Sequence, residues 1–361
     1  MKEPVRLAIA GYGLVGRRHV DAIAQCDRAE VAAVVEPSDA GRAHASDAGF
    51  AVFPSLDALL AADRPDGVIL ATPNSLHVEQ ATACVAVAIP VLVEKPIATR
   101  SEDAEELVRR ANLAGVPVLV GHHRRHNPLI QKAKALIDAG EIGSIRAVQA
   151  TCWFYKPDDY FDVSDWRRMP GAGPISVNLV HDIDLLRYLC GEVSTVRAVA
   201  RPSVRGYANE DVASALLEFE SGAIGTITVS DSIVAPWSWE LTSREYPIYP
   251  PTPENCYMIG GSHGSLSIPD LRVWNYADKD RNWWAPISST TVKRETTDPL
   301  VNQIENFADV IRGTADPLVT GREGLATLQV VEAIQQSAMT GDCIDLRRKT
   351  KIVAAAEGKN I

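Results

Sequence analysis

Apolar runs alternate with amphipathic stretches over the first third of the chain. Short, mostly apolar runs are typical of buried parallel strands, and they occur at residues 5–10, 31–35, 67–71, 90–93 and 116–120. The stretches between them have helical periodicity, at about 14–24, 38–48, 55–62, 76–87 and 101–113. Strands that alternate with helices predict βαβ units, and therefore a doubly wound parallel sheet with right-handed connections.

The pattern changes after about residue 124. One helix is predicted over 127–139, and two late helices at about 301–313 and 322–339. Longer runs of alternating polarity lie between them, at 145–154, 195–201, 212–219, 223–230 and 265–268. This pattern predicts a mostly antiparallel sheet with helices on one face. We therefore expect an α/β protein of two domains, residues 1–123 and 124–361, and the length of 361 residues agrees with that number.

Composition narrows the class of protein. The formal net charge is −10, and no basic cluster is large enough to follow a phosphate backbone, so we expect no nucleic-acid partner. The six cysteines form no C-x-x-C and no metal-ligand spacing, which predicts reduced packing residues and no metal site. The first strand begins within about five residues, which leaves no room for a signal peptide, and no apolar stretch is long enough to cross a bilayer. We expect a soluble cytoplasmic protein without a membrane partner.

The first apolar run leads directly into Gly11-Tyr12-Gly13-Leu14-Val15-Gly16, which matches G-x-G-x-x-G. In this motif the first glycine allows a tight turn, the second lets a pyrophosphate approach the backbone, and the third lets the helix pack closely on the strand. The pyrophosphate then lies at a helix N-terminus, where free N–H groups and the helix dipole favour an anion. The motif predicts dinucleotide binding, and the alternative is an ordinary turn between strand and helix.

Glu36 ends the second apolar run, twenty positions after Gly16. A carboxylate at this place accepts hydrogen bonds from the hydroxyls of the adenosine ribose and repels a 2′-phosphate. We therefore expect NAD. NADP is the alternative, because Arg17, Arg18 and Arg42 are near in sequence and an arginine can hold a 2′-phosphate.

Two polar segments follow later strands of the predicted parallel sheet. Ala71-Thr72-Pro73-Asn74-Ser75-Leu76-His77 follows the third strand, and ligands bind at the carboxyl ends of such strands. Thr72 and Asn74 are candidates for contact with the nicotinamide ribose, and the alternative for Asn74 or Ser75 is a helix N-cap.

Val93-Glu94-Lys95-Pro96 follows the fourth strand. A lysine in the crevice at a strand end can donate to a substrate hydroxyl, and burial lowers the pKa of such a group towards neutrality. The Lys95–Pro96 bond is a candidate for cis geometry. The alternative is a solvated lysine in a turn.

A glycine-rich turn at 171–173 leads into a helix that carries His181. Asn178 and Asp184 each lie three residues from His181, so they share its helical face, and Asp184 is placed to orient the ring. The alternative is a structural histidine on the helix.

Taken together, these motifs resemble the glucose–fructose oxidoreductase/inositol dehydrogenase (Gfo/Idh/MocA) family. The resemblance covers nearly the whole chain. It implies an N-terminal Rossmann domain, a C-terminal α/β domain with an open sheet, and NAD(P)-dependent hydride exchange with a hydroxyl of a sugar, cyclitol or related polyol. It rests on G-x-G-x-x-G with His19, A-T-P-N-x-x-H at 71–77, E-K-P at 94–96, G-H-H-R-R-H-N-P at 121–128, Asp165-Trp166-Arg167, the glycine turn with His181, and Gly321-Arg322-Glu323-Gly324.

The resemblance assigns Lys95 and His181 as the catalytic residues. The family often carries Asp or Asn four residues before the histidine, and this chain has Val177 there. Because valine cannot relay a proton, we expect the polar partner to have moved to Asn178.

Further candidate residues come from the same motifs. For substrate binding they are Arg124, Trp166, Arg167, Asn178 and Asp182, with Arg125 and residues 231–258 as further parts of the pocket. A planar guanidinium suits bidentate contact with a carboxylate or with sugar hydroxyls, and the alternative for the arginines is salt bridging between domains. For cofactor binding they are Gly11, Tyr12, Gly13, Leu14, Val15, Gly16, Glu36, Thr72, Pro73, Asn74, His77, Glu94 and Lys95.

These residues predict an NAD-dependent dehydrogenase acting on a secondary hydroxyl of a sugar, cyclitol or sugar acid. The alternatives are a redox-neutral isomerase or eliminase with tightly held NAD, and a non-catalytic NAD-binding sensor on the same fold. An open sheet face with apolar residues in 223–229 also predicts a homodimer or homotetramer.

Overall fold

The computed structural model describes residues 3–277 and 281–347. The chain forms two compact units. The first unit consists of the chain up to Asn127 together with Thr297–Leu328. The second consists of Pro128–Thr296 together with the chain from Gln329 onward. The expected division into 1–123 and 124–361 does not include this return of a late segment to the first unit. Its physical cause is an apolar helix, Pro299–Ile311, which covers one face of the first sheet.

The first unit contains a six-stranded parallel sheet in the order β3-β2-β1-β4-β5-β6. The strand order reverses between β1 and β4, which is the switch point where doubly wound sheets bind ligands. Five of these strands were predicted, and β3 was not, because it has only two residues. The strands are β1 (Val5–Ala10), β2 (Ala29–Val35), β3 (Val52–Phe53), β4 (Gly67–Leu70), β5 (Val91–Val93) and β6 (Val118–Val120).

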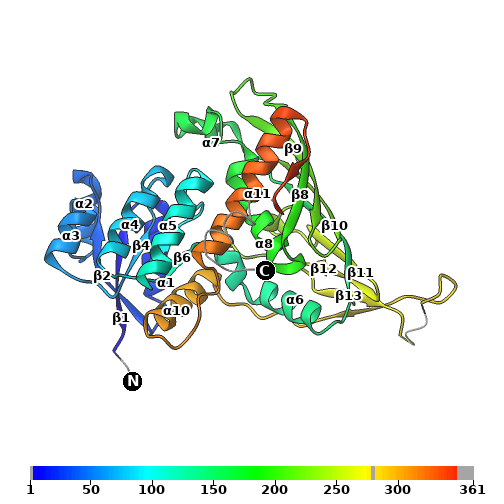
Figure 1. The fold of residues 1–361 in the computed structure, drawn as a ribbon, viewed down its shortest axis with the longest axis horizontal. Helices are drawn as coiled ribbons and strands as arrows, with labels where there is room; N and C mark the ends of the chain where they lie inside the picture. Colours follow the sequence, from blue (N-terminus) through cyan, green and yellow to red (C-terminus); the bar gives the residue numbers. More distant parts are fainter. Residues whose placement is uncertain (1–2, 278–280, 348–361) are drawn as a thin grey trace. The chain divides into compact units, whose positions relative to one another are not determined.

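Helices cover both faces of this sheet (Figure 1). Apolar residues of α3, α4 and α5 pack on one face, and those of α1 and α10 pack on the other. Local chemistry sets several helix ends: Ser38 and Ser55 cap α2 and α3, and Gly115 ends α5 in the left-handed conformation. The helices are α1 (Leu14–Ile23), α2 (Asp39–Asp47), α3 (Leu56–Ala62), α4 (His77–Ala86), α5 (Ser101–Ala114) and α10 (Pro299–Ile311), and they confirm the predicted doubly wound architecture.

The second unit contains a nine-stranded sheet among its described residues, in the order β14-β13-β12-β11-β7-β10-β9-β8-β15. Neighbouring strands are antiparallel except β7 and β10, which confirms a mostly antiparallel sheet. The strands are β7 (Ile145–Trp153), β8 (Val193–Pro202), β9 (Glu210–Phe219), β10 (Ile224–Ser230), β11 (Tyr257–Gly261), β12 (Gly264–Ile268), β13 (Arg272–Asn275), β14 (Ser288–Thr291) and β15 (Ile344–Asp345).

One face of this second sheet is covered by helices α6 (Pro128–Asp138), α8 (Val180–Cys190) and the later part of α11 (Gly321–Thr340) (Figure 1). Burial alternates along β9 and β10, with alternate side chains directed into this core and the others exposed. The short helices α7 (Asp158–Asp162) and α9 (Trp239–Thr242) lie in the connections from β7 to β8 and from β10 to β11. Residues 231–258 are irregular apart from α9 and the start of β11, as the composition of that stretch predicted.

Candidate active site

The glycine turn after β1 has the geometry that its sequence predicts. Gly11 has a φ of 90°, which favours glycine. A Cβ on Gly16 would lie 1.8 Å from the carbonyl oxygen of Gly11, so only glycine lets α1 approach the strand this closely. A Cβ on Gly13, by contrast, would meet no heavy atom within 4 Å. The turn is therefore close-packed beneath and open where a pyrophosphate would approach.

Glu36, at the end of β2, is held across the glycine turn. Its Oε2 accepts a hydrogen bond from the N–H of Tyr12 at 3.1 Å, and its Oε1 accepts from the N–H and the hydroxyl of Ser38 at 3.0 and 2.7 Å. Burial alone would raise the pKa of Glu36, but these hydrogen bonds and the nearby Arg42 outweigh it and lower the pKa. The carboxylate is therefore ionised and fixed beside the turn, as a partner for ribose hydroxyls must be.

Two of the three arginines that favour NADP in the sequence, Arg18 and Arg42, have other partners. Arg42 donates to the backbone oxygens of Glu36 and Pro37 at 3.1 and 2.6 Å and forms an ion pair with Asp39. Arg18 forms an ion pair with Asp298 at 3.2 Å. Arg17, by contrast, is exposed, so it stays the candidate for holding a 2′-phosphate.

The segment after β4 contains two kinds of residue. Pro73 and Asn74 are exposed, and no side chain caps α4, so the capping alternative for Asn74 is not observed. His77 is fully buried. Its Nδ1 lies 2.8 Å from the carbonyl oxygen of Pro96, and its Nε2 lies 3.0 Å from the carbonyl oxygen of Thr72. The ring of His77 therefore connects the turns after β4 and β5. Contact of His77 with the cofactor stays a prediction.

Lys95 follows β5 at the same carboxyl edge of the sheet as Gly11, with β4 between them. The Lys95–Pro96 bond is cis, as predicted. The N–H of Lys95 donates to Oε2 of Glu94 at 3.2 Å, and Oε1 of Glu94 lies 2.7 Å from Nε2 of the buried His19. The sequence identified Lys95 and Glu94, but it indicated His19 only as part of a family motif.

A short helical turn at His123–His126, which follows β6 in the first unit, consists entirely of basic residues. Arg124 and Arg125 are both buried. Arg125 forms an ion pair with Glu323 at 2.8 Å, so the salt-bridge alternative applies to Arg125 within this unit.

In the second unit, His181 lies in the first turn of α8, directly after a π-helical turn at Ile175–Leu179. Such turns are frequent at functional sites. His181 and Val177 are half-buried, whereas Asn178 is buried and its Oδ1 has no hydrogen-bond partner among the described residues. This oxygen keeps the capacity to accept a hydrogen bond from a ligand. That Asn178 is the polar partner of His181 stays a prediction.

Two carboxylates, one buried and one half-buried, accept hydrogen bonds near His181. Asp182 is fully buried and accepts a hydrogen bond from the hydroxyl of Tyr257 on β11. Glu210 on β9 accepts from the N–H of Ile175 at 3.0 Å, and burial raises its pKa. Substrate binding by Asp182 stays a prediction; the structure shows its side chain fully buried and hydrogen-bonded to Tyr257. Sequence reasoning missed Tyr257 and Glu210 because both come from distant strands.

The segment Asp165–Arg168 presents the other predicted substrate residues. Trp166 is 53% exposed. The guanidinium of Arg167 stacks on the ring of Tyr160 at 4.1 Å and donates to the backbone carbonyl oxygen of Tyr160 at 2.6 Å. Arg167 is therefore oriented by its own unit, with Trp166 beside it in the chain and open to a ligand.

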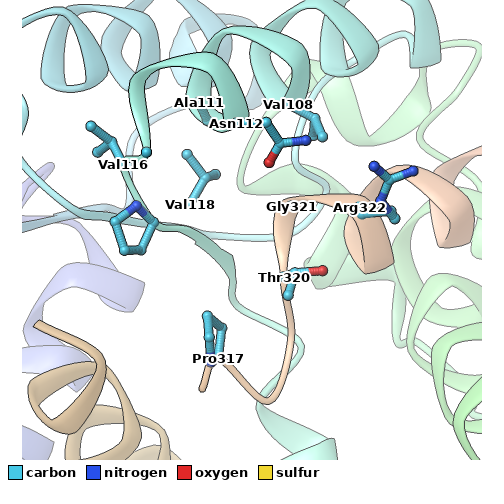
Figure 2. Close-up of a pocket in the computed structure, with 11 residues that line it drawn as sticks. Val108, Ala111, Asn112, Val116, Val118, Pro317, Thr320, Gly321 and Arg322 are labelled. Atoms are coloured by element: carbon cyan, nitrogen blue, oxygen red, sulfur yellow. The ribbon is translucent and has the colours of Figure 1, made fainter. Parts of the chain in front are cut away.

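A hollow of about 370 Å³ lies elsewhere in the first unit, between α5, the residues leading into β6 and the start of α11 (Figure 2). Its lining is mostly apolar, with Asn112, Thr320 and Arg322 as its polar side chains. Val116 and Pro117 precede β6, so this hollow is not at the carboxyl edge that holds Lys95. Among the described residues, no group of His, Cys, Asp or Glu is arranged to hold a metal, and no helix is long and apolar enough to cross a membrane.

Comparison with known proteins identifies the family. A family model described as "Oxidoreductase family, NAD-binding Rossmann fold" matches residues 5–122, and the "GFO/IDH/MocA C-terminal domain" model matches residues 130–267. The crystal structure of the WlbA dehydrogenase from Bordetella pertussis in complex with NADH and UDP-GlcNAcA is 30% identical, with a TM-score of 0.77 over 95% of this chain and 99% of that one. The chain belongs to the Gfo/Idh/MocA oxidoreductase family.

Two curated Gfo/Idh/MocA relatives match along most of their length. The rhizopine catabolism protein MocA of Rhizobium meliloti is 25% identical over 91% of this chain and 93% of its own. Inositol 2-dehydrogenase of Mycolicibacterium gilvum is 28% identical over 97% of this chain and 95% of its own. The open turn at Gly13 and the ionised Glu36 agree with the NAD-binding Rossmann fold of this family.

Proposed function

We propose that this Gfo/Idh/MocA member is an NAD-dependent dehydrogenase that oxidises a secondary hydroxyl of a sugar, cyclitol or sugar acid, or reduces the corresponding ketone. The observation that carries the proposal is the shared sheet edge of the glycine turn and Lys95. The turn follows β1 and Lys95 follows β5, one strand beyond the switch point. Ligands of doubly wound sheets bind at this edge.

The cofactor supplies the nicotinamide carbon that exchanges hydride, and the protein supplies binding and proton handling. Gly13 would let the pyrophosphate approach the start of α1, Gly11 and Gly16 would keep the turn and helix close-packed, and Glu36 would accept from the adenosine ribose. Lys95 would donate to the substrate oxygen and stabilise the negative charge that develops there.

His181 is the proposed general base for the substrate hydroxyl. A histidine is suited to this task because its ordinary pKa lies near neutrality. Asn178 would orient the substrate through its amide, since an amide orients a partner but exchanges no proton at neutral pH. Asp182, anchored by Tyr257, would keep the helix of His181 in place.

The substrate class follows from the relatives and from two side chains. Relatives include an inositol dehydrogenase and a dehydrogenase crystallised with a nucleotide-linked sugar acid. Trp166 offers an exposed ring, which suits the apolar face of a sugar, and Arg167 offers a guanidinium that is already oriented. We therefore propose a polyhydroxylated ring as the substrate. Comparing sugar acids with neutral sugars tests whether the substrate also carries a carboxylate.

A panel of sugars, cyclitols and sugar acids, followed by NADH absorbance, tests this function. The proposal expects NADH formation with at least one member, and loss of that rate in Lys95→Ala. The matched variant Lys132→Ala changes a lysine of α6 outside the proposed site and should keep the rate. Absence of NADH formation across the panel, with NAD binding retained, would favour a non-catalytic NAD-binding protein.

We also propose assembly through the open face of the second sheet. Exposed apolar side chains on that sheet include Val199, Leu216, Ile224 and Met258, which lie on β8, β9, β10 and β11. A second copy of the chain would remove them from water. A cytoplasmic location stays a prediction from sequence.

A further inference from the structure

Glu94, the residue before Lys95, lies where several elements of the first unit meet. Its N–H donates to the Leu70 oxygen at the end of β4 at 2.9 Å. Its Oε1 lies 2.7 Å from Nε2 of His19, which belongs to α1, the helix that follows the glycine turn. Its Oε2 accepts from the N–H of Lys95 at 3.2 Å. One carboxylate therefore connects the dinucleotide-binding helix to the backbone of the proposed catalytic lysine.

The space around this carboxylate is set by Gly121, which follows β6. A Cβ on Gly121 would lie 2.9 Å from the carboxyl carbon of Glu94 and 3.0 Å from both of its oxygens. Any larger residue at position 121 must displace Glu94 or the end of β6. The position of the carboxylate is thus fixed from a third strand as well.

The hydrogen bond from His19 has a defined direction. His19 is fully buried, and its Nδ1 has no partner among the described residues. An ionised carboxylate only accepts hydrogen bonds, so the Nε2 of His19 carries the proton and donates to Glu94. The ring therefore orients the carboxylate from a fully buried position.

The charge of Glu94 is also defined. Burial alone would raise its pKa, but the hydrogen bond from His19 and the charges of His19, His123 and Lys95 lower the pKa to about 2. The side chain is 15% exposed, so solvent screens this charge only in part. A fixed negative charge next to Lys95 favours the ammonium form of the lysine.

We propose that Glu94, oriented by His19, is a positioning residue that fixes the turn of Lys95 and holds its amine in the charged, hydrogen-bond-donating form. The proposal rests on the role of Lys95 in the proposed function. The proposal assigns a role to the pair His19 and Glu94, which connects helix α1 of the dinucleotide site to the turn that carries Lys95.

Competitive labelling of lysines with acetic anhydride, followed by peptide mass spectrometry, tests this proposal on the full chain without substrate. Only a neutral amine reacts. Removing a nearby opposite charge lowers the pKa of an ammonium group, so Glu94→Gln should increase labelling of Lys95 several-fold near pH 8. Glu79→Gln removes an exposed carboxylate of α4 and should leave Lys95 labelling unchanged.

Gly121→Ala provides a second variant that keeps every charge but displaces Glu94, and it covers the case in which Glu94→Gln does not fold. It should increase Lys95 labelling in the same direction. Unchanged labelling in a folded Glu94→Gln or Gly121→Ala protein, judged by its melting temperature, would overturn the proposal. Because labelling needs no turnover, failure of every polyol in the activity panel would contradict the proposed function alone.

Discussion

Replacing Glu36 with alanine should change the choice of cofactor. In the structure, Oε1 accepts two hydrogen bonds from Ser38 and Oε2 accepts one from Tyr12. A carboxylate has about four acceptor sites, so about one remains for a ribose hydroxyl. A hydrogen bond to a charged group contributes about 1.5–3 kcal/mol, so Glu36→Ala should lower kcat/KM for NAD about 10- to 150-fold. NADP should lose less, because the same change removes repulsion of its 2′-phosphate.

The assay is kcat/KM for both cofactors with one active polyol, for the wild type, Glu36→Ala and Glu36→Gln. Glutamine keeps the shape and one acceptor oxygen, so it should retain more NAD activity than alanine does. Melting temperatures control for the lost contacts to Tyr12 and Ser38. A Glu36→Ala enzyme with unchanged kcat/KM for NAD, or a wild type that uses NADP equally well, would refute the assignment of Glu36.

Three further predictions follow from the same geometry. Lys95→Ala and His181→Ala should each lower kcat by about 10²–10⁴-fold, with NAD affinity nearly unchanged in a fluorescence titration. Asn178→Ala should lower kcat less. A His181→Ala enzyme that keeps most of the wild-type kcat would show that this histidine is structural. Gly16→Ala should lower the free energy of unfolding by about 1–3 kcal/mol in thermal unfolding, since its Cβ would lie 1.8 Å from a backbone oxygen. Gly13→Ala should keep the melting temperature, because its Cβ meets nothing within 4 Å, and should weaken NAD binding, because that space is where the pyrophosphate would approach. Light scattering at micromolar concentration should show a dimer or tetramer, and a monomer would contradict assembly through the open sheet face.

Much of the first unit could be predicted because its signals are local. The glycine turn, Glu36 and Lys95 each directly follow a short apolar strand, and in a parallel sheet the ends of such strands meet at one edge. The strand and helix ranges followed from periodicity alone, with β3 too short to give a pattern.

The remainder depends on contacts between residues far apart in the sequence. His77 is buried because its ring reaches carbonyl oxygens of two different turns, and no local pattern specifies that. Asp182 is removed from the surface by Tyr257, 75 residues away. The return of α10 to the first sheet likewise follows from apolar packing across the chain, through residues such as Ile304 and Phe307.

The account rests on hydride transfer between the carbon of a CH–OH group and NAD, at a site containing Lys95, with the hydroxyl proton passing to a base. The most direct measurement uses polyols deuterated at the CH–OH carbons, with mass spectrometry of the NADH formed. The account predicts deuterium in the nicotinamide ring of NADH from the wild type with at least one sugar, cyclitol or sugar acid, and none from Lys95→Ala over the same time. A wild-type protein that binds NAD yet transfers deuterium from no member of these classes would contradict it.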